Sequence, residues 1–290
     1  MDLSFENSIR SLSNKYTEEG PYYTSYPSVG GWSKEFGPQD YELGLDKLFS
    51  EDKSVPISLY LHYPFCPELC SYCCCYVVIS DNEDRMREFS RHLLEELDIF
   101  IDYFKRKSIV PNVKEIHFGG GSPNVMGRDE LDPLILKLKE FVDIESLDEC
   151  ALEIDVRNVD REKIEYFSEK GINRISFGIQ DFNHDVQVAV NRVQPVELVE
   201  KILTPDIRAR FKSINFDILW GLPKQTRTTF RETVKTLQHF SPDKITLLHY
   251  GHYPDVYKHQ SLINSADIPP YFEQNLMNIE AVLKLEDCGY

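Results

Sequence analysis

Apolar residues after position 55 alternate between two patterns along the chain. Short runs rich in β-branched and aromatic residues are each followed by a longer segment in which apolar residues recur every three or four positions. The short runs predict strands, and the longer segments predict helices with one buried face. The six predicted strands are Ser58–Tyr63, Glu115–Gly119, Ala151–Asp155, Arg174–Ile179, Asn215–Trp220 and Lys244–Tyr250.

Capping residues mark the ends of two predicted helices. Asp160 is placed to cap a helix that Gly171 ends, and Thr226 is placed to cap a second helix that runs to Phe240. Aspartate and threonine side chains accept hydrogen bonds from the free amide groups of a first turn, and glycine ends helices because it tolerates positive φ. These signals support a helix after the third strand and another after the fifth.

Six strand–helix pairs in series predict an α/β fold with parallel strands and crossover helices. The strands are short apolar runs, as expected where both faces of a sheet are covered. Six units fall short of a closed eight-fold barrel, but in an open sheet and in a barrel alike the ligand site lies beyond the carboxyl ends of the strands. Residues 1–52, rich in Tyr, Ser and Gly, form a less regular N-terminal extension to the domain of residues 53–290.

Composition narrows the classes of function. The chain has 290 residues, 41% of them apolar, and a formal net charge of −16. That charge argues against general binding of nucleic acid or of an anionic membrane, and the apolar runs are shorter than a membrane span requires. A cytoplasmic protein with reduced thiols is expected, in which local arginines must bind any anionic substrate.

The most informative chemistry lies in a ten-residue segment that begins at Cys66. Cys66, Cys70 and Cys73 have the spacing Cys-x3-Cys-x2-Cys, and Cys74 and Cys75 follow at once. Three thiolates on one loop can hold three irons of a four-iron cluster and leave the fourth iron open to another ligand. Disulfides are one alternative, but adjacent cysteines bridge poorly. Structural zinc is a second, although no second ligand pair stands at the usual distance in the sequence.

Polar residues gather at the ends of later strands. The run Gly119–Pro123 follows the second strand, and its glycines let a ligand lie against the backbone, although a tight turn is the simpler interpretation. Carboxylates suit amino groups and ribose hydroxyls, and a guanidinium suits a carboxylate. The pattern fits a ligand with all three groups, of which S-adenosylmethionine is one. The polar residues concerned are Glu153, Asp155, Gln180, Asp181, Arg192 and Asp217.

Together these motifs resemble the radical S-adenosylmethionine superfamily and, more narrowly, the oxygen-independent coproporphyrinogen III oxidases. The narrower resemblance covers nearly all of residues 20–290 and implies a partial (β/α)6 barrel of the radical S-adenosylmethionine type. It rests on further stretches of the chain, which are Tyr22–Pro27, Tyr60-x-His62, Ile179–Asn183, Asn191-Arg192 and Gly221–Thr226.

The resemblance also implies cofactors and their contacts. One [4Fe-4S] cluster is implied on Cys66, Cys70 and Cys73, and Cys75 matches a cysteine that the family needs for activity but not as a cluster ligand. Two molecules of S-adenosylmethionine are implied. The matched contacts are Tyr60, Gly120 and Glu153 for the first molecule, and Tyr72, Gly121, Ser122, Gln180, Arg192, Asp217 and Gly251 for the second.

The implied reaction is the oxidative decarboxylation of two propionates of coproporphyrinogen III to vinyl groups, which gives protoporphyrinogen IX in haem biosynthesis. A one-electron donor such as a flavodoxin or ferredoxin reduces the cluster, and a 5′-deoxyadenosyl radical abstracts hydrogen from each propionate. Candidate propionate ligands are Arg157, Arg174 and Lys258, and a monomer is expected. Two alternatives stay open: a haem-binding chaperone, whose relatives usually lack the Cys73–Cys75 pair, and another radical enzyme acting on a tetrapyrrole.

The sequence departs from the family at a few positions. Cys74 stands where Gly is common, Ser122 where Thr is usual, Tyr72 where Phe is usual, and Gly251 where Ala is usual. The chain also ends at Tyr290, where the family continues with a further strand and a helical domain that helps to cover the substrate. The C-terminal helical domain is therefore expected to be absent from these residues.

Overall fold

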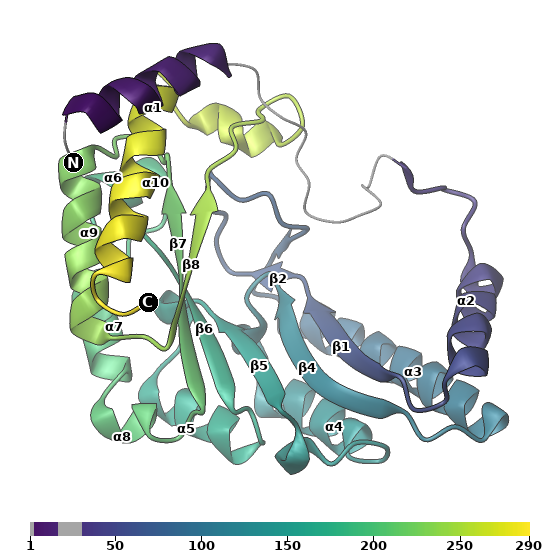
Figure 1. Cartoon of the computed structure of the whole chain (residues 1–290). Coiled ribbons are helices and arrows are strands. Elements are labelled where there is room, and N and C mark those ends of the chain that lie inside the picture. The colour runs from purple at the N-terminus through teal and green to yellow at the C-terminus, as the bar shows by residue number, and fades with distance from the viewer. Residues whose placement is uncertain (1–2, 17–30) are drawn as a thin grey trace.

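The computed structural model describes residues 3–16 and 31–290, and the stretch Tyr22–Pro27 noted above lies outside them. Its centre is a six-stranded parallel sheet in the order β1-β4-β5-β6-β7-β8 (Figure 1). All six predicted strands are confirmed, with ends that shift by up to three residues. The strands are β1 (Pro56–Tyr63), β4 (Asn112–Gly120), β5 (Glu149–Ile154), β6 (Arg174–Gln180), β7 (Ser213–Trp220) and β8 (Lys244–His249).

Helices follow the strands and lie along the outer face of the curved sheet (Figure 1). In the described part of the chain, β1 and β8 are the edges of the sheet, so the six units form an arc. This arrangement fits the expected α/β partial barrel. The helices after β1 are α3 (Glu83–Lys107), α4 (Arg128–Leu138), α5 (Arg161–Glu169), α6 (His184–Ala189), α7 (Val196–Ile202), α8 (Pro205–Arg208), α9 (Arg227–Phe240) and α10 (Tyr271–Glu286).

The predicted helix caps are confirmed. The Asp160 side chain accepts a hydrogen bond from the amide of Lys163 at 2.9 Å, at the start of α5. Gly171 follows that helix with a φ of 91°, a conformation that glycine adopts without a steric penalty. The Thr226 side chain accepts from the amide of Thr229 at 3.2 Å, at the start of α9. Local sequence therefore sets where these two helices begin.

The two faces of the sheet differ in polarity, because side chains along a strand alternate between faces. Ile116 and Phe118 of β4 point outward and are buried under the helices. On the inner face of β6 and β7, Ser176 Oγ and Asn215 Nδ2 both donate to Asp217, at 2.6 and 2.7 Å. The expectation of strands that are apolar on both faces is therefore wrong for these strands, whose inner face carries polar groups that satisfy one another.

The segment before the sheet is more regular than expected. α1 (Leu3–Lys15) packs on α10, where the Arg10 guanidinium lies 4.0 Å from the centre of the Phe272 ring. α2 (Pro38–Glu51) packs against α3 on the other side of the molecule (Figure 1). The expectation of an irregular extension is therefore wrong for both helices.

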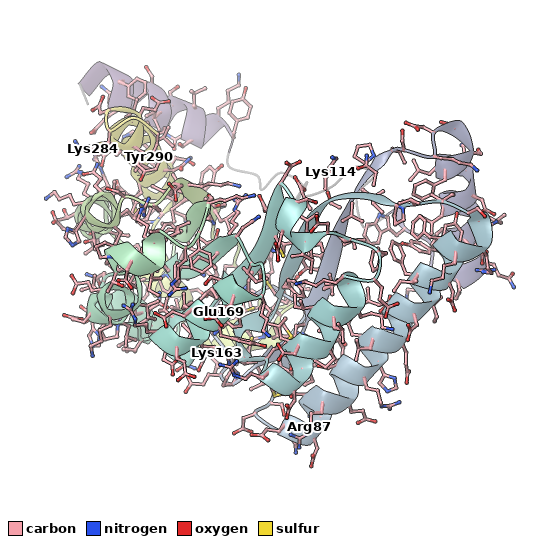
Figure 2. All side chains as sticks on the ribbon, turned by 90° about the horizontal axis from the view of Figure 1, so that it is seen from below. Arg87, Lys114, Lys163, Glu169, Lys284 and Tyr290 are labelled. Atoms are coloured by element: carbon pink, nitrogen blue, oxygen red, sulfur yellow. The ribbon has the colours of Figure 1, made fainter. Side chains whose placement is uncertain are left out.

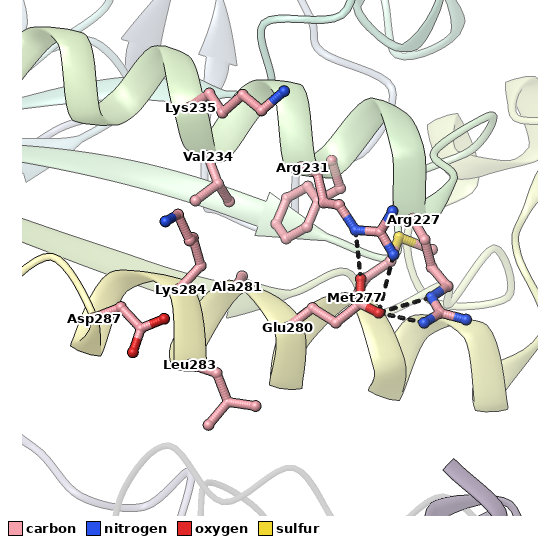
Figure 3. A pocket seen from close by; sticks show the side chains of 11 residues that line it. Arg227, Arg231, Val234, Lys235, Met277, Glu280, Ala281, Leu283, Lys284 and Asp287 are labelled. Atoms are coloured by element: carbon pink, nitrogen blue, oxygen red, sulfur yellow. Dashed lines mark hydrogen bonds and ion pairs between the residues drawn. The ribbon is translucent and has the colours of Figure 1, made fainter. Parts of the chain in front are cut away.

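A groove of about 430 Å³ separates α9 from α10 on the outside of the molecule (Figure 3). Glu280 of α10 accepts hydrogen bonds from Arg227 and Arg231 of α9, with one contact to each at 3.0 Å. Arg227 also donates to Glu6 of α1 at 2.7 Å. We call Arg227 and Arg231 the outer arginine pair. Its ion pairs tie α1, α9 and α10 together.

Charged side chains surround the outside of the helices (Figure 2). Arg87 on α3 and Glu169 on α5 are examples, and both are exposed. Among residues 3–16 and 31–290, no helix combines the length and the apolar character needed to cross a bilayer.

Candidate active site at the rim of the sheet

A cavity of about 620 Å³ opens at the carboxyl ends of the strands, where the fold class predicted a ligand site. Its wall combines the cysteine loop after β1, the glycine turn after β4, the ends of β5, β6 and β7, and the loop after β8. Every residue that the resemblance matched to the cluster, to S-adenosylmethionine or to catalysis lines it, with the exception of Tyr60. These residues are Cys66, Cys70, Tyr72, Cys73, Cys75, Gly120, Gly121, Ser122, Glu153, Gln180, Arg192, Asp217 and Gly251.

The cysteine loop is closed at its base by two short parallel strands. β2 (Phe65–Cys66) pairs with β3 (Val78–Ile79), and the amide of Ser80 donates to the carbonyl of Cys66 at 3.0 Å. Two-residue strands carry no measurable hydrophobic period, so the sequence could not predict them. The pairing holds the thiols on one compact loop above the end of β1.

Burial and mutual contact change the acidity of the loop thiols. Burial raises the pKa of Cys66 to about 11, although Ser122 Oγ lies 3.5 Å from its sulfur and opposes the shift. The hydrogen bond between Cys73 and Cys75 raises the pKa of Cys73 and lowers the pKa of Cys75. A metal that binds Cys66 and Cys73 must therefore displace their protons, which makes metal binding dependent on pH.

The described residues include no group of three or more His, Cys, Asp or Glu side chains placed to hold a metal ion as they stand. The fit of the site to an iron cluster therefore rests on the shared cavity, on the cations beside it and on the donor set. Soft thiolate ligands on one loop are the donors that iron–sulfur clusters use.

Two arginines meet at the cysteine loop, and we call them the rim arginine pair. Arg192 and Arg157 share the carboxylate of Asp155, with nitrogen–oxygen distances of 2.9 and 2.7 Å. Each also places a terminal nitrogen 3.5 Å from Cys70 Sγ. Burial by itself would raise the pKa of Asp155, but the charge of Arg192 and the hydrogen bonds from Arg157 hold it below its usual value. The carboxylate therefore stays ionised and fixes both guanidiniums.

Arg192 keeps part of its hydrogen-bonding capacity free in the described structure. Its Nη2 donates to the carbonyl of Gly178 at 2.7 Å, but its buried Nε has no hydrogen-bond partner among the described residues. A buried donor without a partner costs about 1–3 kcal/mol. A Cβ on Gly178 would lie 3.0 Å from Gln180 Nε2 and 3.1 Å from Arg192 Nη2, so this glycine leaves room for both polar groups. These features fit a ligand that offers an acceptor to Arg192.

Glu153 also lines the cavity, and it contacts a histidine that sequence reasoning missed. His117 Nε2 donates to Glu153 at 3.0 Å, and the amide of Gly120 donates to its other oxygen at 3.2 Å. The Tyr60 ring stacks on His117 with centroids 5.6 Å apart, and burial followed by the charge of Glu153 raises the pKa of Tyr60 to about 12. Tyr60 lies beside His117 and does not itself line the cavity. Strand alternation on β4 was the signal that could have placed His117 on the inner face.

The glycine turn has a steric reason of its own. Gly120 has a φ of 121°, and a Cβ there would lie 2.7 Å from the His62 ring. A Cβ on Gly121 would lie 2.5 Å from the carbonyl oxygen of Pro64. The glycines are therefore needed for the close approach to β1 and the loop after it, and Gly120 and Gly121 also line the cavity.

The remaining rim residues divide into two groups. Gln180 lines the cavity with a φ of 65°, a strained value for a residue with a side chain. Asp217 also lines it, although both of its oxygens accept internal hydrogen bonds. Asp181 is buried away from the cavity, where it accepts from Thr233 Oγ1 at 2.7 Å and Gln225 Nε2 at 2.6 Å, and is a structural residue.

Of the three candidate propionate ligands, Arg157 lines the cavity. Arg174 begins β6, at the opposite end from the cavity, and pairs with Glu149. Lys258 is exposed on the loop after β8. The suggestion that Arg174 binds a propionate is therefore wrong, because strand direction was not used to separate the two ends of the sheet.

Known proteins resemble this chain in sequence and in fold. A model of the radical S-adenosylmethionine superfamily matches residues 60–237. The chain is 34% identical over 281 residues to the oxygen-independent coproporphyrinogen III oxidase of Pseudomonas aeruginosa, and 31% identical over 279 residues to that of Escherichia coli. Each alignment covers 96% of this chain but 60% and 59% of the relatives, so the chain spans about three fifths of their length.

Solved structures show the same fold. The coproporphyrinogen III oxidase of Escherichia coli, described as a radical S-adenosylmethionine enzyme, matches with a TM-score of 0.85 and 30% identity, over 93% of this chain and 60% of that one. SuiB of Streptococcus suis, solved with S-adenosylmethionine, matches in fold alone with a TM-score of 0.53 and 13% identity, over 99% of this chain and 60% of that one. Since the family model covers more than half of the sequence, the chain belongs to the radical S-adenosylmethionine superfamily.

Proposed function

We propose that this chain is the radical S-adenosylmethionine part of an oxygen-independent coproporphyrinogen III oxidase, an oxidoreductase of haem biosynthesis. The observation that carries the proposal is one cavity shared by Cys66, Cys70 and Cys73, by Glu153, and by Arg192 with its unpaired Nε. The identity of 34% across 96% of the chain to an enzyme of that name supports the choice of substrate.

The cavity residues suit two kinds of cofactor. When bound, a reduced [4Fe-4S] cluster and S-adenosylmethionine would supply a 5′-deoxyadenosyl radical, which would take a hydrogen from a propionate β-carbon; carbon dioxide would then leave, one electron would pass to an external acceptor, and a vinyl group would remain. Cys66, Cys70 and Cys73 hold the cluster, while the nearby guanidinium groups of Arg157 and Arg192 offset its negative charge.

We further propose two S-adenosylmethionine sites on opposite walls. Glu153 accepts a hydrogen bond from the amino group of the first molecule, and Tyr60 and Gly120 also contact that molecule. Arg192 pairs through Nε and Nη2 with the carboxylate of the second, in the two parallel hydrogen bonds that a guanidinium offers. The other residues of the second site are Tyr72, Gly121, Ser122, Gln180, Asp217 and Gly251.

Cys75 has a separate role in this proposal. Its amide donates to Cys73 Sγ at 3.4 Å, and its own side chain is exposed and lines the cavity. We assign it to catalysis, as a thiol that can exchange hydrogen with the substrate, and not to the cluster. The Cys75→Ser variant should keep its iron and form no product.

The cellular setting is part of the same proposal. The protein is a cytoplasmic monomer that a flavodoxin-type or ferredoxin-type donor reduces by one electron, with no nucleic-acid or membrane partner. The net charge of −16 supports the last point, because it repels polyanionic surfaces. Residues 53–290 are the proposed partial barrel, and residues 1–52 its N-terminal extension.

Anaerobic product analysis tests the proposed function. The purified chain, reconstituted with iron and sulfide, receives a chemical reductant, S-adenosylmethionine and coproporphyrinogen III, and Cys70→Ser is the matched control. We expect 5′-deoxyadenosine and vinyl products from the wild type and neither from the control. Formation of 5′-deoxyadenosine with another tetrapyrrole alone would instead favour a different radical enzyme. Haem binding without cleavage of S-adenosylmethionine would favour the chaperone.

A further inference from the structure

A second set of contacts reaches the cysteine loop from the loop after β8. The short 3-10 helix η5 (Lys258–Leu262) carries Gln260, whose side chain is fully buried. Gln260 Nε2 donates to the carbonyl of Tyr72 at 3.0 Å and to the carbonyl of Gly251 at 3.2 Å. Its Oε1 accepts from the amide of Tyr253 at 2.5 Å. One side chain therefore joins two walls of the cavity.

The neighbouring residue makes a parallel contact. His259 Nε2 lies 2.7 Å from the carbonyl oxygen of Cys73, and because a carbonyl can only accept, the proton is on Nε2. The carbonyls of Tyr72 and Cys73 are thus both held from η5. These are consecutive peptide groups, so the contacts fix the backbone on both sides of the Cys73 α-carbon.

The other half of the loop is held from a different element. Asn191 Nδ2 donates to the carbonyl of Leu69 at 2.8 Å, and the amide of Ser71 donates to the carbonyl of Val190 at 2.9 Å. The segment after α6 therefore fixes the backbone around Cys70, and η5 fixes the backbone around Cys73. The loop is held from two sides, and each side serves a different cysteine.

Simple packing does not account for a glutamine at position 260. Burying a primary amide is unfavourable unless its donors and acceptor are satisfied, and an apolar side chain of the same volume would fill the space without that requirement. Gln260 meets the requirement by binding Tyr72, Gly251 and Tyr253, and its Nε2 also lies 3.2 Å from Cys74 Sγ. Its hydrogen bonds therefore all go to residues that line the cavity.

We propose that His259 and Gln260 are positioning residues that clamp the Cys73–Cys75 half of the cysteine loop to the loop after β8. The clamp sets the direction of the Cys73 thiol, which the proposed function makes an iron ligand, and of the Cys75 thiol beside it. It also links Tyr72 to Gly251, which belong to opposite walls of the proposed second S-adenosylmethionine site. The inference rests on the proposed function because the clamp matters only if the loop carries a cluster.

The rate of iron loss tests the clamp without using enzyme activity. The reconstituted full chain is mixed anaerobically with an iron chelator, well below the melting temperature of each variant. Gln260→Met keeps the side-chain volume but loses every hydrogen bond to the loop. We expect iron to leave about 10-fold faster or more, the usual effect of removing a group that orients a metal ligand. His259→Ala should accelerate the loss less, since it frees one carbonyl.

Gln225→Met is the matched control. Gln225 is 2% exposed, and its Nε2 donates to Asp181 at 2.6 Å and to the carbonyl of Leu219 at 2.8 Å. This variant should lose stability, because it leaves a buried carboxylate short of a donor, and should release iron at the wild-type rate. Equal acceleration in the control would overturn the clamp, since general loosening would then explain the effect.

The remaining outcomes are equally decisive. Wild-type release rates in both Gln260→Met and His259→Ala, beside a wild type that holds its cluster, overturn the clamp and leave the proposed function intact. If Gln260→Met does not fold, the half-buried His259 carries the test alone. A wild type that takes up no cluster overturns the proposed function and the clamp together.

Discussion

The rim arginine pair and the outer arginine pair are built alike. Arg157 and Arg192 share Asp155 at the rim, and the outer pair shares Glu280 between α9 and α10 (Figure 3). A second acid joins one arginine in each group, Glu68 at the rim and Glu6 outside, so the charges match. What differs is burial. The side chains of Arg192 and Asp155 are 7% and 6% exposed, against 25% and 52% for Arg227 and Arg231 and 13% for Glu280.

The two pairs also differ in which groups the guanidiniums contact besides the shared carboxylate. At the rim, both arginines reach Cys70 Sγ and one buried N–H of Arg192 lacks a partner among the described residues. Outside, the arginines bind acids from two other helices and hold α1 and α10 in place. The same local motif is therefore our proposed ligand site in one region and a structural tie in the other. Burial and the further groups that the arginines contact distinguish the two roles.

The largest expected effect is a difference in iron content between the cysteine variants. Changing Cys66, Cys70 or Cys73 to Ser should abolish the cluster, because an alcohol is a poor ligand for iron in place of a thiolate. Cys75→Ser should retain the iron. Iron and sulfide analysis after anaerobic reconstitution measures both. A full iron load in all three ligand variants would show that the rim arginines do not face a cluster site.

Removing the shared carboxylate tests burial directly. Asp155→Asn leaves the buried guanidinium of Arg192 without its anion and Arg157 with Glu68 alone, and should lower the free energy of unfolding by about 3–5 kcal/mol. Glu280→Gln removes the matching acid from a more exposed group and should cost about 1 kcal/mol. Urea denaturation of the metal-free protein under anaerobic conditions compares the two. Equal losses would mean that the two regions do not differ as described.

Replacing Arg192 tests whether it binds S-adenosylmethionine. Arg192→Ala and Arg192→Lys should keep the cluster and lower the stoichiometry of bound S-adenosylmethionine from two towards one, with a loss of about 2–4 kcal/mol at that site. Lysine fails because it keeps the charge and loses the paired geometry. Arg231→Ala is the matched control from the outer pair and should bind as the wild type does. An unchanged two-site isotherm for Arg192→Ala eliminates its proposed role.

The smallest effect is a dependence of stability on pH at the outer pair. Burial would raise the pKa of Glu280, but hydrogen bonds from Arg227 and Arg231 lower it below its usual value of 4.5. Its contribution is therefore complete above pH 4.5 and is lost as the pH falls through the lowered value. The wild type should lose about 0.5 kcal/mol more than Glu280→Gln between about pH 5 and pH 3. High salt should shrink that difference, and no difference at low salt contradicts the ion-pair account.

Much of this structure follows from short-range signals in the sequence. The alternation of runs and helical periods predicted all six strands, and Asp160 and Thr226 predicted where two helices begin. The cysteine spacing and the glycine turn located the cavity wall. These succeed because strand periods, helix caps and close approaches are determined within a few residues.

The features that the sequence did not predict depend on contacts between distant segments. Strand alternation could have placed His117 on the inner face, but its contact with Glu153 depends on the alignment of β4 with β5. Gln260 joins Tyr72 across almost two hundred residues, a pairing that no local pattern encodes. The polar inner face was misread because the runs looked apolar throughout, although strand alternation places Ser176 and Asp217 on one side.

The most direct test of the central claim is the electron paramagnetic resonance spectrum of the reduced, reconstituted wild-type protein with and without S-adenosylmethionine. If the rim cavity holds both cofactors, S-adenosylmethionine should change the signal of the reduced [4Fe-4S] cluster, and Arg231→Ala should give the same change. A spectrum that S-adenosylmethionine leaves unaltered at saturating concentration, in protein with a full cluster, would contradict the claim.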